Sequence, residues 1–364
     1  MSAPLALLAA GGTGGHLFPA EALAGALRAR GFEVDLATDA RAARYAGSFP
    51  ARAIHVLPAE TVRSRSPVAL ARTALTLGWG LVSGLALMRR VKPAIVVGFG
   101  GYPTVPPLLA ARLSGIPTLV HEANGVMGRA NRLLAPRVSA IATGFADIFA
   151  TDPALAAKAT WTGNPLRPAV LAAATGDYPP LDGQLGLLVF GGSQGARVMS
   201  DVVPSAIARL DGHLRARLTV VQQAREEDLA RVRAAYADAG VAAEVAPFFS
   251  DLPARMAAAH LVVSRSGALT VAELAAIGRP SILVPLPHAL DQDQAANARS
   301  LERIGGAVMM RQEAFTPDAL AAELTRLAAD PQALTQMAQA ARSAGTLDAT
   351  ERLADLVARM ARGA

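Results

Sequence analysis

One pattern occurs twice in this chain, about 180 residues apart, and it limits the folds that the chain can adopt. An apolar run leads into a glycine-rich loop, and the loop leads into a segment with helical periodicity. The first copy spans residues 5–31, and the second begins at residue 185. An apolar run, a glycine loop and a helix in that order are typical of a parallel α/β sheet with crossover helices. We therefore expect an α/β protein of two Rossmann-like, doubly wound parallel-sheet domains that face each other across a cleft.

Further short apolar runs follow each glycine loop and end in small or polar residues, as strands covered on both faces do. They span 32–39, 95–103, 118–124 and 140–145 in the first half, and 218–223, 243–249, 261–267 and 281–287 in the second. Between the halves, the prolines and glycine of 161–170 interrupt this alternation and indicate a hinge near 163–168. We predict an N-terminal domain over 1–163, a C-terminal domain over 164–346, and a helix over 347–364 that packs back on the first domain.

The amino-acid composition excludes several classes of protein. With 364 residues, 52% of them hydrophobic and 18% charged, the chain is globular and long enough for two cores. It has no cysteine, which excludes a disulfide scaffold, thiolate metal ligands and thiol catalysis. The formal net charge of +6 is spread along the chain and aromatic residues make up only 4%, so we expect no nucleic-acid partner. The surplus charge favours a negatively charged substrate or membrane surface.

One apolar segment raises the question of a membrane. Residues 68–87 are about long enough to span a bilayer, but Arg72 and three glycines argue against a transmembrane helix. The basic residues Arg63, Arg65, Arg72, Arg89, Arg90 and Lys92 surround an apolar face that contains Leu75, Trp79 and Val82. Such a segment can lie in the interface of an anionic membrane. The alternative is an ordinary core helix whose outer face carries arginines.

The most informative stretch is 264–298, where polar residues follow two apolar strands. Its first part predicts a helix over 268–278 that ends at a glycine. Ser266, Thr270 and Glu273 lie near the start of that helix, whose free N–H groups attract phosphate. A carboxylate repels phosphate, so a neutral polyol suits Glu273 better, such as a ribose whose two hydroxyls can both donate to it. The alternative makes Ser266 an N-cap and Glu273 a solvated helix residue.

A second polar cluster follows the strand 281–287. Its members are His288, Asp291, Gln292, Asp293, Gln294 and Asn297. Ligands of open α/β sheets bind at the carboxyl ends of strands, so both clusters are candidate binding residues. Asp291 and Asp293 also match the D-x-D pattern of some metal-dependent glycosyltransferases, which we interpret as coincidence because the pattern lies in a loop of a doubly wound domain. His121 and Glu122 form another possible pair of metal ligands, but no third ligand lies at helical spacing, and we expect no metal site.

The two glycine loops, 11–16 and 191–196, can bring backbone N–H groups close to an anion. Neither loop matches G-x-G-x-x-G or the Walker pattern. Asp39, at the end of the second strand, could bind a ribose in a dinucleotide site, so a nicotinamide enzyme remains an alternative. His16 ends the first loop and is a candidate base, because the free pKa of histidine lies near neutrality.

Seven motifs occur in one order along the chain. They are GGTGGHLFPA (11–20), GFGGYPT (98–104), HEAN (121–124), TGNPLR (162–167), GGSQGA (191–196), SRSGALTVAEL (264–274) and the loop 285–298. In sequence and in order they resemble the motifs of the MurG family of glycosyltransferases, and the resemblance covers nearly the whole chain. It implies a two-domain GT-B fold and the family's activity, the conversion of lipid I to lipid II in bacterial peptidoglycan synthesis. The acceptor is then expected in the N-terminal domain, and UDP-N-acetylglucosamine mainly in the C-terminal one.

The resemblance also implies a set of substrate-binding residues, carried over motif by motif. They are Thr13, Gly14, Gly15, Asn124 and Arg167, followed in the second half by Ser193, Phe249, Ala268, Leu269, Thr270, Val271, Ala272, Glu273 and Gln294. Within this set, Glu273 is expected on the ribose, the backbone of Phe249 near the uracil, and Gln294 on the donor sugar. Three positions depart from the family's pattern: Ala123 stands where glutamine is usual, and Gln292 and Asp293 stand where many members have aspartate and histidine.

The implied reaction is an inverting transfer. The 4-hydroxyl of the muramyl sugar attacks the anomeric carbon of the donor, a base takes the hydroxyl proton, and the leaving pyrophosphate is stabilised. His16 is the first candidate for the base and Glu122 the second. The second glycine loop with Ser193, Arg167 and a helix N-terminus would meet the leaving charge, so we expect neither a metal nor another cofactor.

The same resemblance implies a peripheral protein on the cytoplasmic face of the cell membrane, and for this reason we expect 63–92 to contact an anionic membrane surface. Two alternatives to the implied activity remain. The first is another GT-B enzyme that uses a UDP-sugar, such as a hexosamine epimerase or a lipid glycosyltransferase. The second is a non-catalytic protein that binds a nucleotide sugar.

Overall fold

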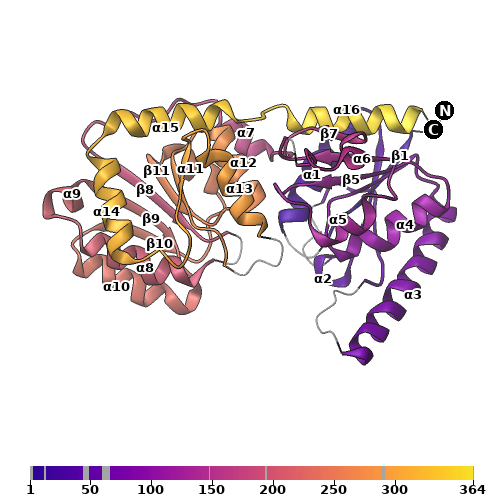
Figure 1. Cartoon of the computed structure of the whole chain (residues 1–364), viewed down its shortest axis with the longest axis horizontal. Coiled ribbons are helices and arrows are strands. Elements are labelled where there is room, and N and C mark those ends of the chain that lie inside the picture. Colours follow the sequence, from indigo (N-terminus) through magenta and orange to yellow (C-terminus); the bar gives the residue numbers. More distant parts are fainter. Residues whose placement is uncertain are drawn as a thin grey trace. The chain divides into compact units, whose positions relative to one another are not determined.

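The computed structural model describes most of the chain. It covers residues 3–11, 14–43, 49–59, 66–146, 148–192, 195–287 and 292–363. The chain forms two compact units (Figure 1): the first comprises Met1–Arg167 and Asp348–Ala364, and the second comprises Pro168–Leu347. The chain passes from the first unit to the second after Arg167, and the sequence prediction placed this boundary after residue 163.

Within the described residues, the first unit contains a seven-stranded parallel sheet in the order β3-β2-β1-β4-β5-β6-β7. Its strands are β1 (Leu5–Ala9), β2 (Glu33–Thr38), β3 (Ala53–Val56), β4 (Ile95–Gly98), β5 (Thr118–Glu122), β6 (Ala140–Thr143) and β7 (Ala159–Trp161). The strand β1 pairs with β2 and β4, and Leu7 lies opposite Asp35 and Val96. Every residue of β1 is buried, as expected of a strand covered on both faces.

Helices connect the strands of the first unit. They are α1 (Gly14–Ala29), α2 (Ala40–Ala43), α3 (Pro67–Val91), α4 (Val105–Leu113), α5 (Arg129–Leu134), α6 (Pro153–Ala156) and α16 (Ala349–Arg362), with a 3-10 turn at Tyr102–Thr104. The helix α16 comes from the end of the chain and lies beside α1 (Figure 1). Leu353 and Val357 of α16 are buried in one cluster with Leu23 and Leu27 of α1, so the C-terminal helix completes a core of the first unit.

The described part of the second unit contains a six-stranded parallel sheet in the order β10-β9-β8-β11-β12-β13. Its strands are β8 (Leu185–Phe190), β9 (Leu218–Gln223), β10 (Ala242–Ala246), β11 (Leu261–Ser264), β12 (Ser281–Leu283) and β13 (Ala307–Met309). The strand β12 ends at Leu283, earlier than the expected strand 281–287. Pro285 and Pro287 explain the difference, because proline has no N–H to donate to a neighbouring strand.

The helices of the second unit lie on both faces of its sheet. They are α7 (Pro168–Ala173), α8 (Arg197–Ala208), α9 (Gly212–Arg217), α10 (Leu229–Asp238), α11 (Leu252–Ala258), α12 (Ala268–Ile277), α13 (Asp293–Glu302), α14 (Pro317–Ala328) and α15 (Pro331–Ser343), with a 3-10 turn at Glu226–Asp228. The helix α12 confirms the helix predicted over 268–278. It ends where Gly278 takes a left-handed φ of 71°, the usual conformation of a glycine that terminates a helix.

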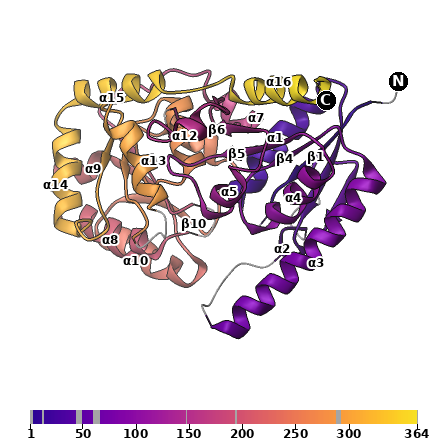
Figure 2. The same ribbon diagram turned by 45° about the vertical axis from the view of Figure 1, so that its right-hand side comes forward.

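The helix α3 has 25 residues and lies along α4 (Figure 2). Gly84 allows the two helices to approach closely, because a Cβ at this position would lie 2.9 Å from the Cβ of Ala110. On the opposite face of α3, Leu75, Trp79 and Val82 are exposed to 76%, 65% and 55%. Toward the end of the helix, Leu87 and Met88 are buried in a core cluster while Arg89 and Arg90 are exposed, so α3 is a core helix whose outer face is apolar as well as basic. None of the helices in the described part of the chain combines the length and hydropathy that a bilayer span requires.

Candidate functional site

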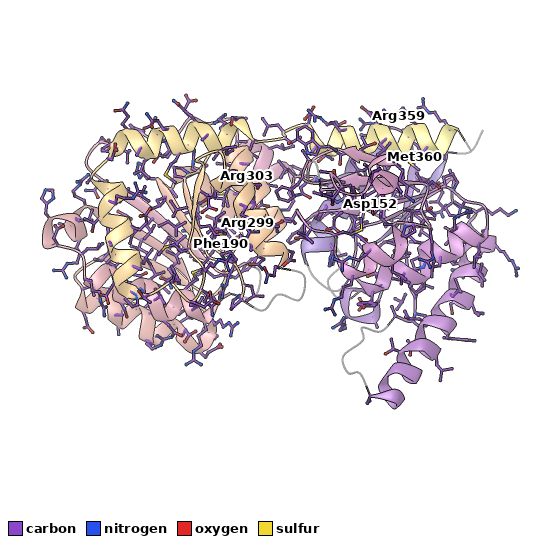
Figure 3. All side chains as sticks on the ribbon, viewed as in Figure 1. Asp152, Phe190, Arg299, Arg303, Arg359 and Met360 are labelled. Carbon is purple, nitrogen blue, oxygen red and sulfur yellow. The ribbon has the colours of Figure 1, made fainter. Side chains whose placement is uncertain are left out.

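Both sheets have the strand order of a doubly wound fold, and each order reverses beside its first strand. The reversal lies between β1 and β4 in the first unit and between β8 and β11 in the second. Ligands of open α/β sheets bind outside the carboxyl ends of strands at such a switch point. The segments that follow these four strands are the two glycine loops, the motif 98–104 and the stretch that begins at Arg265. Figure 3 labels Phe190, where β8 ends and the second glycine loop begins.

His16 lies in the first turn of α1, which begins at Gly14 and so includes the last two glycines of the loop. Its Nδ1 is 3.0 Å from the carbonyl oxygen of Gly11 and donates to it. In the neutral ring the proton is then on Nδ1, and Nε2 carries none. Burial lowers the pKa of His16 from its ordinary value of 6.5, although the Gly11 hydrogen bond opposes this shift. His16 is therefore neutral at pH 7, with Nε2 as its basic atom.

Two glycines of the motif GFGGYPT pack against the His16 ring. Gly100 and Gly101 have left-handed φ values of 91° and 75°, which only glycine adopts without strain. A Cβ on Gly100 would lie 3.3 Å from Cδ2 of His16 and 3.5 Å from Nδ2 of Asn131. A side chain at this position would crowd the histidine, so glycine at position 100 leaves room for the His16 ring.

Glu122, the last residue of β5, is buried and accepts four hydrogen bonds. Its Oε1 accepts from the backbone N–H of Asn124 at 2.9 Å and from Nδ2 of the same residue at 3.2 Å. Its Oε2 accepts from the backbone N–H of Gly128 and from Nδ2 of Asn131, both at 2.9 Å. Burial raises the pKa of Glu122, and these hydrogen bonds oppose the rise. The carboxylate thus holds the loop after β5 and fixes the amide of Asn124.

His121 points its Nε2 at the carbonyl oxygen of Gly163, at 3.1 Å, and donates to it. Its side chain is fully buried, and burial lowers its pKa to about 4. The ring lies 5.6 Å from that of Phe99, centroid to centroid. His121 is therefore a neutral core residue that joins β5 to the segment after β7. Among the described residues, no group of three or more histidine, aspartate or glutamate side chains is placed to hold a metal ion.

In the second unit, Ser266 joins the starts of α12 and α13. Its hydroxyl donates to the carbonyl oxygen of Gln294 at 2.8 Å, and its own carbonyl oxygen accepts from Nδ2 of Asn297 at 3.1 Å. The N-cap of α12 is Gly267, without a side-chain capping bond. The alternative that made Ser266 an N-cap is therefore wrong, because its hydroxyl bonds to a residue on another helix.

Glu273 is only 7% exposed, so the alternative that made it a solvated helix residue is also wrong. It lies on α12, the helix that follows the switch-point strand β11. At the start of this helix Leu269, Thr270 and Ala272 are partly exposed, while Ala268 and Val271 are buried. A buried carboxylate close to a partly exposed helix start is a suitable acceptor for neutral hydroxyl groups.

Gln223 joins two predicted site segments that the sequence analysis did not connect. Its Oε1 accepts from the backbone N–H of Gly191 at 3.1 Å, and its Nε2 donates to the carbonyl oxygen of Pro247 at 3.2 Å. The second glycine loop is thereby held to the segment that leads to Phe249, whose ring centroid lies 4.3 Å from the guanidinium of Arg255. The signal in the sequence is the pair of glutamines that ends the otherwise apolar strand β9.

Arg167 is the last residue of the first unit before the chain enters the second. Its guanidinium lies 4.6 Å from the ring centroid of Phe18 on α1, two residues beyond His16. Several predicted residues lie outside the described residues: Thr13, Ser193, His288, Asp291, Arg63 and Arg65, together with the side chain of Arg72.

Two domain families match the chain. Residues 6–143 match the glycosyltransferase family 28 N-terminal domain, and residues 186–357 match the glycosyltransferase family 28 C-terminal domain. A UDP-N-acetylglucosamine--N-acetylmuramyl-(pentapeptide) pyrophosphoryl-undecaprenol N-acetylglucosamine transferase of Bradyrhizobium sp. (strain ORS 278) is 64% identical over 362 residues, 99% of each chain. The transferase of the same name from Rhodopseudomonas palustris (strain BisB18) is also 64% identical, over 99% of this chain and 96% of its own.

Solved structures agree with these relatives. The crystal structure of Acinetobacter baumannii MurG has a TM-score of 0.81 and 31% sequence identity, and covers 98% of this chain and 99% of its own. The UDP-GlcNAc 2-epimerase from Neisseria meningitidis has a TM-score of 0.68 at 15% identity, which shows a shared fold alone. The neighbours and the two parallel sheets confirm the predicted GT-B class of fold. By its domains, its relatives and its fold, the chain belongs to glycosyltransferase family 28 and, within it, to the MurG family.

Proposed function

We propose that this chain transfers N-acetylglucosamine from UDP-N-acetylglucosamine to the 4-hydroxyl of the muramyl sugar of lipid I, which gives lipid II. The observation that carries the proposal is the 64% identity, over 99% of the chain, to transferases named for this reaction. An epimerase activity has less support, because the solved epimerase is 15% identical and shares only the fold. Membership of a glycosyltransferase family also speaks against the nicotinamide enzyme suggested by Asp39.

In this proposal the second unit binds the donor nucleotide. The carboxylate of Glu273 accepts hydrogen bonds from the ribose hydroxyls, and the backbone of Phe249 lies near the uracil. Gln294 contacts the donor sugar. The remaining donor-binding residues are Ser193 of the glycine loop and Ala268, Leu269, Thr270, Val271 and Ala272 of α12. Support comes from the switch-point position of these segments and from the burial of Glu273, which removes its carboxylate from competing water.

The first unit supplies the base. Nε2 of His16 accepts the proton of the acceptor hydroxyl as the oxygen bonds to the anomeric carbon, and the bond to the UDP oxygen breaks on the opposite face, with inversion. The bond from Nδ1 to Gly11 and the lowered pKa of His16 support this role, because both leave Nε2 unprotonated at pH 7. Thr13, Gly14 and Gly15 of the same loop, with Asn124, hold the sugars and the pyrophosphate of the acceptor.

The leaving pyrophosphate is met by Arg167, by the N–H groups of the second glycine loop and by the N-terminus of a helix. Hydrogen-bond donors and dipoles fixed before the reaction stabilise such a charge without reorganisation. These groups can balance the leaving charge, so the proposal includes neither a metal nor another cofactor.

We propose a positioning role for Glu122, the second candidate for the base. Its two oxygens already accept four hydrogen bonds, two of them from Asn124. A carboxylate so engaged would have to give up a loop contact to take a proton. Its contribution is to hold the Asn124 amide in one orientation.

The transfer itself is tested with radiolabelled UDP-N-acetylglucosamine and a lipid I analogue. We expect label in a lipid-linked disaccharide, dependent on the acceptor. Binding of the donor without transfer would identify a non-catalytic binding protein. Conversion of the donor to its 2-epimer without acceptor would identify an epimerase.

We further propose that α3 lies on the cytoplasmic face of the cell membrane as a peripheral contact. Leu75, Trp79 and Val82 form an exposed apolar face, and Arg89 and Arg90 lie in the last turn of the same helix. In flotation with vesicles that contain phosphatidylglycerol, the partition coefficient of the protein should fall at least about a hundredfold when Leu75 and Trp79 become serine, because two buried apolar side chains together contribute about 3–6 kcal/mol.

The control variant for flotation is Ile304→Ser, which changes a 43%-exposed apolar residue of the second unit and should not alter binding. Equal flotation of the α3 variant and the unchanged protein would remove the membrane contact from the proposal.

A further inference from the structure

Arg265 is the first residue after β11 and is only 8% exposed. Its Nη1 donates to the carbonyl oxygens of Val284 at 3.1 Å and Pro285 at 2.9 Å, and its Nη2 donates to Oε1 of Gln312 at 2.5 Å. Val284 and Pro285 follow β12, and Gln312 follows β13. One guanidinium thus joins the carboxyl ends of the neighbouring strands β11, β12 and β13, the edge of the sheet to which the proposed donor site belongs.

The segment that Arg265 holds controls a predicted site residue. The backbone N–H of Leu286, the residue after Pro285, donates to Oε1 of Gln294 at 3.0 Å. Because the carboxamide oxygen is engaged in this bond, the NH₂ group of Gln294 is turned away from the segment. The main chain of Gln294 is fixed as well, since its carbonyl oxygen accepts from the hydroxyl of Ser266, next to Arg265.

We propose that Arg265 is a positioning residue for the donor sugar. It holds residues 284–286 so that Leu286 turns the Gln294 carboxamide, and the NH₂ group of Gln294 then donates to a hydroxyl oxygen of the sugar. This inference rests on the proposed function, in which Gln294 contacts the sugar of UDP-N-acetylglucosamine. It predicts that Arg265 affects the affinity for the sugar part of the donor and leaves the affinity for UDP unchanged.

Arg279 provides a matched control in the same unit. It is 1% exposed, and its guanidinium likewise donates to neutral acceptors, among them the carbonyl oxygens of Ala257 and Asp177. It precedes β12 and so lies at the amino end of this strand, whereas the segment held by Arg265 follows the carboxyl end. A change at Arg279 therefore disturbs a buried arginine of the same kind without reaching Gln294.

The test compares the dissociation constants of UDP and UDP-N-acetylglucosamine by calorimetry on the full chain. Arg265→Lys keeps the charge, but a single ammonium cannot span three acceptors as the guanidinium fork does. We expect the affinity for UDP to stay within about twofold and the affinity for UDP-N-acetylglucosamine to fall about tenfold, or about 1.4 kcal/mol. Arg279→Lys should leave the ratio of the two affinities unchanged.

A double-mutant cycle shows whether Arg265 acts through Gln294. Gln294→Ala alone should lower the affinity for UDP-N-acetylglucosamine to a similar degree, and Arg265→Lys should add nothing in that background. If thermal denaturation shows that Arg265→Lys does not fold, Gln312→Ala replaces it in the double-mutant cycle, because it removes one of the three acceptors of the Arg265 guanidinium. We expect Gln312→Ala to lower the affinity for UDP-N-acetylglucosamine about two- to threefold.

Three results would overturn the inference. They are an equal loss of affinity for both ligands in Arg265→Lys, no loss of affinity for either ligand in Arg265→Lys, and additive losses in the double variant. A different result would overturn the proposed function: the unchanged protein would bind neither UDP nor UDP-N-acetylglucosamine.

Discussion

The two switch points have the same strand order but differ in the side chains that they present. The first carries His16, and Glu122 lies at the end of the neighbouring strand β5; burial shifts the pKa values of these two groups in opposite directions. The described part of the second carries a network of neutral hydrogen bonds among Ser266, Gln294 and Asn297, with the carboxylate of Glu273 nearby in sequence. In the proposed function one scaffold therefore serves two tasks, and the side chains at the strand ends decide which task each unit performs. The first unit is proposed to accept the proton and the second to bind the nucleotide.

The largest effect is expected from His16→Ala, which removes the base from the first unit. Turnover should fall about 10²- to 10⁴-fold, the usual contribution of a general base, while the affinity for UDP stays the same. Single-turnover transfer to a lipid I analogue and UDP calorimetry measure the two quantities. If turnover were unchanged, His16 would not be the base; if UDP affinity fell as well, the division of tasks would not hold.

Glu273→Ala tests the role of the second unit, the binding of the nucleotide. We expect the affinity for UDP to fall about ten- to a hundredfold, because a hydrogen bond to a charged group contributes about 1.5–3 kcal/mol. Equilibrium binding of UDP and of 2′-deoxy-UDP checks the cause: the variant should lose less affinity for the deoxy compound. Equal losses for the two ligands would show that Glu273 does not bind the 2′-hydroxyl.

The pH dependence of kcat/KM tests the protonation state of His16 in the first unit. A base must be deprotonated to act, so activity is present above its pKa and is lost as the pH falls through it. Because burial lowers the pKa of His16, the acid limb should have its midpoint below pH 6.5 and then fall about tenfold per pH unit. A midpoint clearly above pH 6.5 would contradict the lowered pKa of this histidine.

The smallest effect on catalysis is expected from Glu122→Gln. The amide keeps one acceptor oxygen but turns its NH₂ group toward two of the four donors, so we expect a loss of about 1–3 kcal/mol in stability. The kcat/KM for the acceptor should fall less than tenfold, mainly because KM rises while kcat changes little. Thermal denaturation and steady-state kinetics separate the two effects. A loss of kcat as large as that of His16→Ala would return Glu122 to the role of base.

The fold was predictable wherever a local pattern decides the structure. Continuous apolar runs mark the buried strands, and Gly278 ends α12 because its left-handed φ suits glycine. The 281–287 strand was predicted too long because the apolar run continues through Pro285, while pairing stops at Leu283. The family motifs led to the switch points, but the strand orders that define these points come from pairings between distant segments.

The site was less predictable because its key contacts join residues far apart in sequence. From the sequence Ser266 is a possible N-cap, but its hydroxyl donates to the carbonyl oxygen of Gln294, 28 residues further along. From the sequence Glu122 is a possible base, but its carboxylate accepts hydrogen bonds from Gly128 and Asn131. The positions of these two residues depend on how the chain folds after β5. Arg265 belongs to the motif SRSGALTVAEL, but the residues that its guanidinium contacts could be identified only from the structure.

The most direct test of the account is a crystal structure of the protein with UDP. The account predicts that the ribose hydroxyls lie at hydrogen-bond distance from the carboxylate of Glu273, at about 2.5–3.0 Å, outside the carboxyl ends of β8 and β11. A ribose bound at the His16 loop of the first unit, with Glu273 away from the nucleoside, would contradict it.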